Sequence, residues 1–284
     1  MNPFSVVFFL LVFVVADNCY ATLRVSPQQL KEPLSRSNYL ILDARSVEAY
    51  MAGHIPGAIS FPVNLTYHDK QTNGKLVKPK QMQKYLRARG IDINSNVVIY
   101  DNGDLVDAAR LFWALEVYGL RQPKVLDHGY DYWINNNLLI SLDEPSIQVS
   151  QYVAQVNNNR LASKFSTQLA MLNSKKIIID ARAEPAYQGE TSVAKRFGHI
   201  PTAINIPASH NFAMSNGVAS LQPLDELKKL YTNIPRDKKV VIYCAIGRIS
   251  SANYLALREL GYDVANYDAS WKEWGNDFKL PIEK

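Results

Sequence analysis

The sequence contains one pattern twice, and this repeat constrains the fold more than any other feature of the chain. Three motifs recur in the same order: an apolar run ending in Asp-Ala-Arg (40–45 and 177–182), Gly-His-Ile-Pro (53–56 and 198–201) and Val-Val-Ile-Tyr (97–100 and 240–243). A chain of 284 residues is long enough for two ordinary domains. The repeat therefore predicts two domains that share one fold.

Each copy alternates short apolar runs with helical patterns. The runs are rich in β-branched residues and end in charged or turn residues, which is typical of buried strands in a parallel sheet. The predicted strands are 40–42, 97–100 and 124–126 in the first copy and 177–179, 240–243 and 264–267 in the second. An amphipathic helix is expected after each Val-Val-Ile-Tyr run, with Gly119 and Gly261 as terminators. The predicted fold class is α/β, with a parallel sheet in each domain and helices on both of its faces.

The two copies differ where the Val-Val-Ile-Tyr run ends, because Asp101 follows the first run and Cys244 follows the second. Open α/β sheets bind ligands at the carboxyl ends of their strands. Gly247 allows the loop after Cys244 to curl, the next residue is an arginine, and a helix capped by Ser250 and Ser251 is expected to follow. Each feature stabilises a thiolate. We therefore interpret Cys244 as an activated nucleophile and not as a core cysteine.

Taken together, these motifs resemble the two-domain rhodanese family of sulfurtransferases. The resemblance rests on both copies of the repeat, on the Cys-x-x-Gly loop and on Tyr-Asp-Ala-Ser-Trp at 267–271, and it covers nearly all of the chain after residue 21. It implies an active C-terminal domain and an N-terminal domain without the cysteine. In the implied ping-pong reaction, Cys244 takes a sulfane sulfur from a donor such as thiosulfate and passes it to cyanide or a thiol. The resemblance implies no metal and no organic cofactor.

The resemblance also implies roles for residues around the thiol. The N–H groups of the loop would hold the persulfide, and the loop residues are Ala245, Ile246, Gly247, Arg248 and Ile249. Arg182 matches a family arginine near the cysteine and Arg248 lies in the loop, so both are predicted to bind an anionic donor. Further candidates for the pocket are Arg196, which lies in an eight-residue insertion of the second copy, and Trp271.

The loop itself matches neither of the family's two common types. Thiosulfate-using members tend to carry Cys-Arg-Lys-Gly-Val-Thr and mercaptopyruvate-using members Cys-Gly-Ser-Gly-Val-Thr, whereas this chain has Cys-Ala-Ile-Gly-Arg-Ile. Its arginine favours thiosulfate as the donor, with 3-mercaptopyruvate as the alternative. A non-enzymatic persulfide carrier that serves a partner protein also stays open. A cysteine-dependent phosphatase does not fit, because its arginine follows the cysteine by six residues and position 250 is serine.

Composition suggests where the domains begin and end. Residues 1–21 contain no Lys or Arg and carry an apolar run from Phe4 to Ala16, which predicts a secretory signal peptide. An uncleaved membrane anchor is the alternative, although the run is short for one. The prediction continues with an inactive N-terminal domain at 22–140, a polar connection at 141–165 and a catalytic domain at 166–284.

Cleavage near Ala21 would remove Cys19 and leave Cys244 as the single thiol. We therefore expect an exported monomer, periplasmic in a bacterium and secreted otherwise, with no membrane attachment after cleavage. The formal charge is +5, but no basic run is interleaved with aromatic residues, so no nucleic-acid partner is expected. The expected partners are a small anionic sulfur donor and a thiol or cyanide acceptor.

Overall fold

The computed structural model describes residues 22–32, 36, 38–69, 74–215 and 217–284. The predicted signal peptide, with Cys19, lies outside these residues. Within the described ranges, no helix has both the length and the apolar composition that crossing a membrane requires.

The chain forms two five-stranded sheets with the same strand order, and all neighbouring strands in both are parallel. The first sheet runs β1 (Arg24–Val25), β5 (Lys124–Leu126), β4 (Val97–Tyr100), β2 (Leu40–Asp43) and β3 (Ile59–Ser60). The second runs β6 (Leu161–Ala162), β12 (Val264–Tyr267), β11 (Lys239–Tyr243), β7 (Lys176–Asp180) and β8 (Ile204–Asn205). The predicted strands and the duplicated α/β fold are confirmed.

Helices cover both faces of each sheet. In the first half they are α1 (Pro27–Lys31), α3 (Val47–Met51), η1 (Val63–Thr66), α4 (Pro79–Ala88), α5 (Val106–Val117) and α6 (Gly129–Asn135). In the second half they are α7 (Lys164–Met171), α8 (Glu184–Tyr187), η2 (Ala208–Asn211), α9 (Leu224–Leu230), α10 (Ser250–Glu259) and α11 (Ser270–Trp274). The second half adds an antiparallel hairpin of β9 (Phe212–Ser215) and β10 (Val218–Leu221).

Side-chain alternation along the central strands separates the cores. In β4, Val98 and Tyr100 pack into a core with Tyr50 of α3 and Trp133 of α6, whereas Ile99 points to the opposite face. In the second sheet, the equivalent core on the face of Tyr243 contains Trp271 and Trp274. The opposite faces of the two sheets, which carry Ile99 and Ile242, contribute to one core that both domains share. The two domains are therefore joined by a continuous hydrophobic interior.

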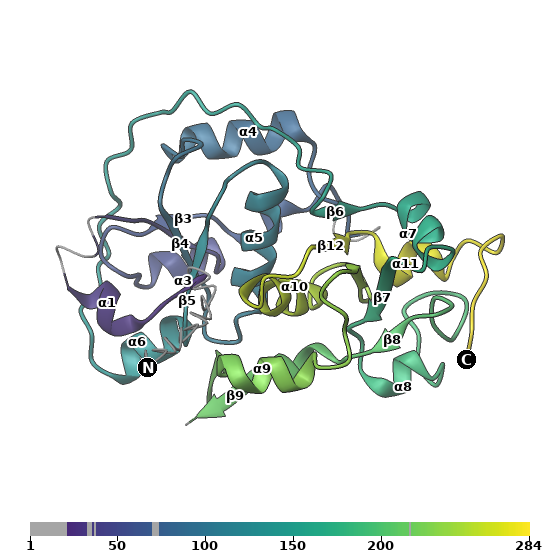
Figure 1. The fold of residues 1–284 in the computed structure, drawn as a ribbon. Coiled ribbons are helices and arrows are strands. Elements are labelled where there is room, and N and C mark those ends of the chain that lie inside the picture. The colour runs from purple at the N-terminus through teal and green to yellow at the C-terminus, as the bar shows by residue number, and fades with distance from the viewer. Residues whose placement is uncertain (1–21, 33–35, 37, 70–73, 216) are drawn as a thin grey trace, which may run out of the picture.

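Helices α5 and α10 lie side by side at the centre of this shared core (Figure 1). Both were expected to be amphipathic, and that prediction is wrong: every residue from Ala108 to Val117 is buried, as are nine of the ten residues of α10. Such all-round burial is typical of a helix inside a core. The predicted terminators hold, because Gly119 and Gly261 adopt φ of 105° and 83° just after the two helices.

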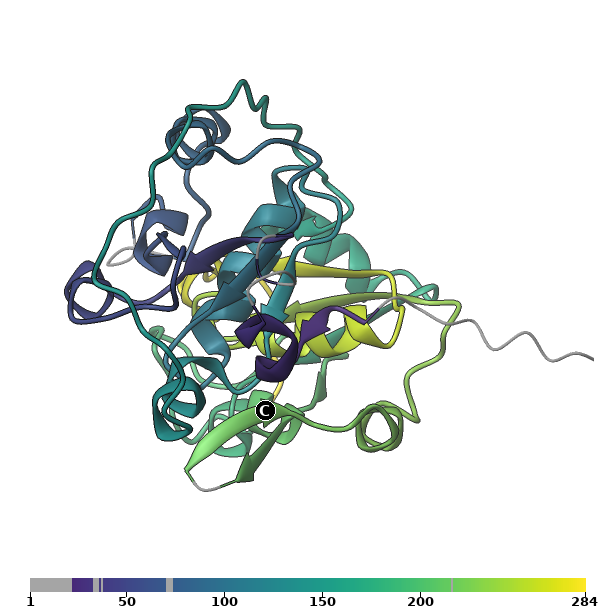
Figure 2. The same ribbon diagram turned by 90° about the vertical axis from the view of Figure 1, so that its left-hand side faces the viewer.

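The β9–β10 hairpin reaches back from the second domain to the first (Figure 2). The N–H of Ala219 donates to the carbonyl oxygen of Gly103 at 3.0 Å, and the N–H of Leu221 donates to the Asp127 carboxylate at 3.2 Å. This bridge lies at the same edge of the domain interface as the loop after β4. It therefore helps to enclose the space between the carboxyl ends of β4 and β11.

Candidate active site

Cys244 follows β11 directly, and its side chain is fully buried. The hydroxyl of Ser250 lies 3.4 Å from Sγ and 2.8 Å from Oδ1 of Asn266. Because one hydroxyl carries one proton, Ser250 can donate to only one of these acceptors at a time. Asn266 in turn donates through Nδ2 to the carbonyl oxygen of Gly247 at 3.2 Å. The thiol is thus tied by a short polar network to its own loop.

The two serines do not cap α10, which corrects the sequence interpretation. The N-cap residue is Ile249, whose backbone is already helical (φ −68°, ψ −28°) and which makes no side-chain cap. Ser250 and Ser251 therefore fall in the first helical turn. Their hydroxyls point back to the loop, where that of Ser251 donates to the carbonyl oxygen of Gly247 at 3.1 Å.

The loop after Cys244 curls at Gly247, as predicted. Gly247 adopts a φ of +69°, and a Cβ there would lie 2.5 Å from the carbonyl oxygen of Asp268. Only glycine fits this close approach without strain. The N–H groups from Ala245 to Ile249 are predicted to bind the outer sulfur of a Cys244 persulfide, and this stays a prediction.

Arg110 reaches the loop from the opposite domain. It lies on α5, is fully buried, and donates to the carbonyl oxygens of Gly247 and Gly74 at 2.8 Å each and to the hydroxyl of Thr66 at 3.2 Å. All three partners are neutral. Burial lowers the pKa of the Arg110 guanidinium, and the charge of Cys244 is among the nearby groups that raise it. The N-terminal domain, which lacks the cysteine, therefore contributes a buried cation beside the loop that follows Cys244.

Arg248, predicted to bind the donor, has a carboxylate partner. Its Nε donates to Oδ1 of Asp107 on α5 at 2.7 Å, in an ion pair between the two domains. Burial would lower the pKa of Arg248, but the hydrogen bond and charge of Asp107 raise it overall. Its charge is therefore largely compensated.

Arg182 also has a carboxylate partner. Its guanidinium donates to both oxygens of Asp180, and the Tyr243 hydroxyl donates to the same carboxylate at 2.6 Å. The first domain repeats this arrangement with Arg45, Asp43 and Tyr100. One difference is that Nη1 of Arg182 is buried without a hydrogen-bond partner among the described residues. The arrangement is one that both copies of the fold use, and the donor-binding role of Arg182 stays a prediction.

The two further candidates pack within the second domain. Arg196 donates to four backbone carbonyl oxygens, those of Trp274, Gly275, Asp277 and Leu280. Trp271 is fully buried, and its indole N–H donates to the Ser192 hydroxyl at 3.0 Å. These contacts anchor the C-terminal segment.

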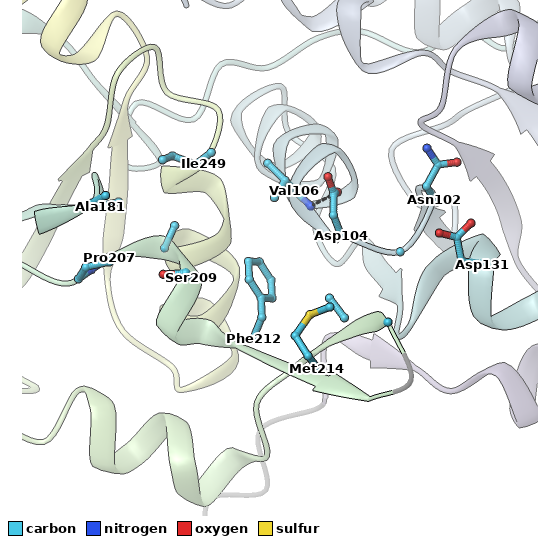
Figure 3. Close-up of a pocket in the computed structure, with 15 residues that line it drawn as sticks. Asn102, Asp104, Val106, Asp131, Ala181, Pro207, Ser209, Phe212, Met214 and Ile249 are labelled. Atoms are coloured by element: carbon cyan, nitrogen blue, oxygen red, sulfur yellow. Dashed lines mark hydrogen bonds between the residues drawn. The ribbon is translucent and has the colours of Figure 1, made fainter. Parts of the chain in front are cut away.

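A cavity of about 490 Å³ lies between the domains at the carboxyl ends of the two sheets. Figure 3 shows Ala181, Pro207, Ser209 and Ile249 of the second domain facing Asn102, Asp104 and Asp131 of the first. Cys244 forms a small apolar cluster with Ala181 and Ala208, against which Phe212 and Ile249 pack. These four residues also line the cavity, so the cavity adjoins the residues that pack around Cys244. Of the residues predicted for the site, Ile249 lines the cavity, whereas Arg182, Arg196, Arg248 and Trp271 do not.

Asp101 occupies in the first domain the place that Cys244 has in the second. Its carboxylate accepts hydrogen bonds from the N–H groups of Gly103 (3.0 Å), Leu105 (3.2 Å) and Ala108 (2.9 Å). The strand end and helix start of this fold therefore gather N–H donors around an acceptor. In the first domain the protein's own carboxylate fills that position.

A family model described as the rhodanese-like domain matches residues 26–136 and 166–277, which together make up most of the chain. The chain belongs to the rhodanese family. A protein of Haloferax volcanii named "Putative thiosulfate sulfurtransferase" is 33% identical to this rhodanese over 248 residues, 84% of this chain and 85% of the relative. The 3-mercaptopyruvate sulfurtransferase of Escherichia coli strain K12 is 29% identical over 250 residues, 85% of this chain and 87% of the relative.

Solved structures agree with this assignment. The crystal structure of the 3-mercaptopyruvate sulfotransferase SseA from Escherichia coli superposes with a TM-score of 0.77 at 26% identity, covering 88% of this rhodanese and 99% of that chain. The expected tandem rhodanese fold is confirmed. This rhodanese is a sulfurtransferase.

Sequence reasoning missed several residues of the site. Asp104 and Asp131 line the cavity, Phe212 lines it and packs against the cluster around Cys244, and Arg110 donates to the loop. None of them lies in the motif around Cys244, and most come from the other domain. Ser250 is a further residue of the site, and its position six residues after the cysteine was visible in the sequence, but the sequence analysis assigned it to helix capping.

Proposed function

We propose that this rhodanese transfers a sulfane sulfur through a persulfide on Cys244. The observation that carries the proposal is the placement of Cys244: it directly follows the central strand of its sheet, packs against residues that line the interdomain cavity, and has the Ser250 hydroxyl 3.4 Å from Sγ. A thiolate at this position would receive a hydrogen bond from Ser250 and would lie close to the buried charge of Arg110.

The proposed reaction has two steps. The Cys244 thiolate attacks the outer sulfur of thiosulfate, a new S–S bond forms, the S–S bond of thiosulfate breaks, and sulfite leaves with the electron pair. With 3-mercaptopyruvate, the thiolate attacks the thiol sulfur, the C–S bond breaks, and the pyruvate enolate leaves and takes up a proton. In the second step an acceptor attacks the outer sulfur of the persulfide. Cyanide then leaves as thiocyanate, and the Cys244 thiolate is restored.

Two donors are candidates, because the relatives are named for thiosulfate and for 3-mercaptopyruvate. The sequence favoured thiosulfate on account of Arg248, but that guanidinium is paired with Asp107. The loop charge therefore gives thiosulfate no advantage over 3-mercaptopyruvate.

The test is to incubate the purified protein with each donor and measure thiocyanate formation from cyanide, together with the gain of one sulfur atom on Cys244 by mass spectrometry. We expect turnover with at least one donor and none in Cys244→Ser. Full activity in Cys244→Ser would overturn the mechanism. Persulfidation of Cys244 without turnover would instead support the alternative of another class, a sulfur carrier that delivers only to a docked protein.

A further inference from the structure

The cavity beside Cys244 has an unusual lining for a site that is expected to receive a small sulfur anion. Its second-domain side is apolar, with Phe212, Met214 and Ile249 as the large side chains. Its first-domain side carries the carboxylates of Asp104 and Asp131. Among the described residues that line it, none is Lys, Arg or His. A dianion entering this space would lose its water without gaining a cation.

Two charged neighbours act on Asp131 in opposite directions. Burial raises the pKa of Asp131, and the charge of Asp104 raises it further, which indicates that the two carboxylates interact. Arg45 acts in the opposite direction on Asp131, but its guanidinium is paired with Asp43 at 2.6 Å.

The cations closest to the thiol do not offset these carboxylates. Arg248 is paired with Asp107 and Arg182 with Asp180, and Arg110 lies behind the loop with its donors on backbone carbonyls. The electrostatic character of the cavity is therefore neutral to negative. Electrostatic complementarity favours a neutral or positively charged ligand in such a site.

We propose that this cavity binds an organic thiol with an apolar body and a neutral or positively charged far end, which takes sulfur from the Cys244 persulfide or, in the form of its own persulfide, gives sulfur to the Cys244 thiolate. The inference rests on the proposed persulfide function and names the substrate class of that same site. An apolar cavity of about 490 Å³ has room for a ring or a branched chain between the wall at Ile249 and the carboxylates of Asp104 and Asp131. A positive group on the far end of the ligand would face those carboxylates.

The sulfur transfer balances without a further reactant. When the ligand is the acceptor, its thiolate attacks the outer sulfur of the Cys244 persulfide, a new S–S bond forms, and the Cys244 S–S bond breaks with its electron pair returning to Sγ. The products are an organic persulfide and the Cys244 thiolate. When the persulfide of this thiol is the donor, the same step runs in reverse: the Cys244 thiolate attacks its outer sulfur, the S–S bond of the organic persulfide breaks, and the thiol leaves with the electron pair.

The experiment uses three thiols of one shape: benzyl mercaptan, its 4-aminomethyl derivative and its 4-carboxyl derivative. Binding is measured by calorimetry with Cys244→Ser, in which no transfer can occur. Sulfur transfer is measured separately with wild-type protein loaded with sodium polysulfide, by following the loss of the persulfide in single turnover. We expect the cationic thiol to bind and react at least about tenfold better than the anionic one, with the neutral thiol between them.

Paired variants locate the effect. Asp104→Asn with Asp131→Asn should reduce the preference for the cation over the anion to near unity, whereas Asp225→Asn with Glu226→Gln, on the exposed helix α9, should leave it unchanged. Preference for the anionic thiol in the wild type, or the same preference in both paired variants, would overturn the cavity assignment. Selective binding to Cys244→Ser without any sulfur transfer in the wild type would support the cavity assignment and overturn the persulfide function instead.

Discussion

Nη1 of Arg110 donates to the carbonyl oxygen of Gly247 at 2.8 Å, across 137 residues of sequence and the interface between the domains. The contact joins the helix of the domain without the cysteine to the loop that begins at Cys244. Arg110 makes no ion pair within 4 Å with any described carboxylate, and its buried charge acts on Tyr67, Asp268 and Cys244. The first domain is therefore part of the thiol site as well as a wall of the cavity.

Replacing Arg110 by methionine should make Cys244 less reactive. The variant keeps an apolar stem of similar length but removes a buried positive charge near the thiolate. We expect alkylation of Cys244 by iodoacetamide at neutral pH to slow by about tenfold, the effect of roughly 1.4 kcal/mol. The control is Arg258→Met, which breaks the interdomain pair with Glu116 and does not touch the loop. Equal losses of alkylation rate in the two variants would mean that loosening the interface, and not the charge of Arg110, controls the reactivity of the thiol.

The hydroxyl of Ser250 should stabilise the Cys244 thiolate. Removing it in Ser250→Ala deletes the hydrogen bond to Sγ, and a hydrogen bond to a charged group contributes about 1.5 to 3 kcal/mol. We expect sulfur transfer to slow by about tenfold or more. The matched control is Ser251→Ala, the next residue of the same buried turn, whose hydroxyl bonds the Gly247 carbonyl instead. If Ser251→Ala lost as much activity as Ser250→Ala, the effect would belong to the loop conformation and not to the thiolate.

Much of the fold could be predicted because local sequence determines it. The β-branched runs define the central strands, and Gly247 marks a position in the loop after Cys244 where a Cβ would clash. The duplication predicted two sheets of one topology. What could not be predicted is the shared core, since the residue pattern of α5 or α10 alone does not reveal that a second helix covers its other side.

The charges of the site were also hidden from the sequence. Arg248 was counted as a free cation because its partner, Asp107, lies in the other domain. The cavity itself exists only where two loops far apart in sequence meet, so its acidic side could not be read from either copy. Serine is a common capping residue, and the sequence does not reveal that the backbone of Ile249 is already helical. Ile249 is therefore the N-cap residue, and Ser250 lies inside the helix.

The paired arginines Arg45 and Arg182 allow a structural role to be separated from donor binding. Each donates to a buried aspartate two residues before it, with nearly identical geometry. Removing one partner of a buried pair costs about 3 to 5 kcal/mol, so Arg45→Ala and Arg182→Ala should lower the free energy of unfolding to a similar degree in urea titrations. Steady-state kinetics of Arg45→Lys and Arg182→Lys then test binding. A donor KM raised only in Arg182→Lys would support the predicted donor-binding role of Arg182, and equal KM values in the two variants would leave both arginines with a structural role alone.

Asp101 should make the stability of the protein depend on pH. Burial raises the pKa of this carboxyl to about 8 and the charge of Asp104 raises it too, outweighing the N–H donor of Ala108, which lowers it. The Asp101 carboxyl of the folded protein therefore binds its proton more tightly than the same carboxyl in the unfolded chain, whose pKa has the ordinary value near 3.8. Its contribution to stability is complete below about pH 4 and is lost as the pH rises through about 8.

The comparison with Asp101→Asn isolates this contribution, because asparagine keeps an acceptor oxygen and does not titrate. Urea unfolding at several values between pH 5 and 8 should show the wild type losing at least about 1 kcal/mol more than the variant, the free energy of roughly one unit of pKa shift. Parallel pH profiles would mean that the three N–H donors keep Asp101 ionised throughout. In that case the first domain would hold a permanent carboxylate at the position where the second domain has its thiol.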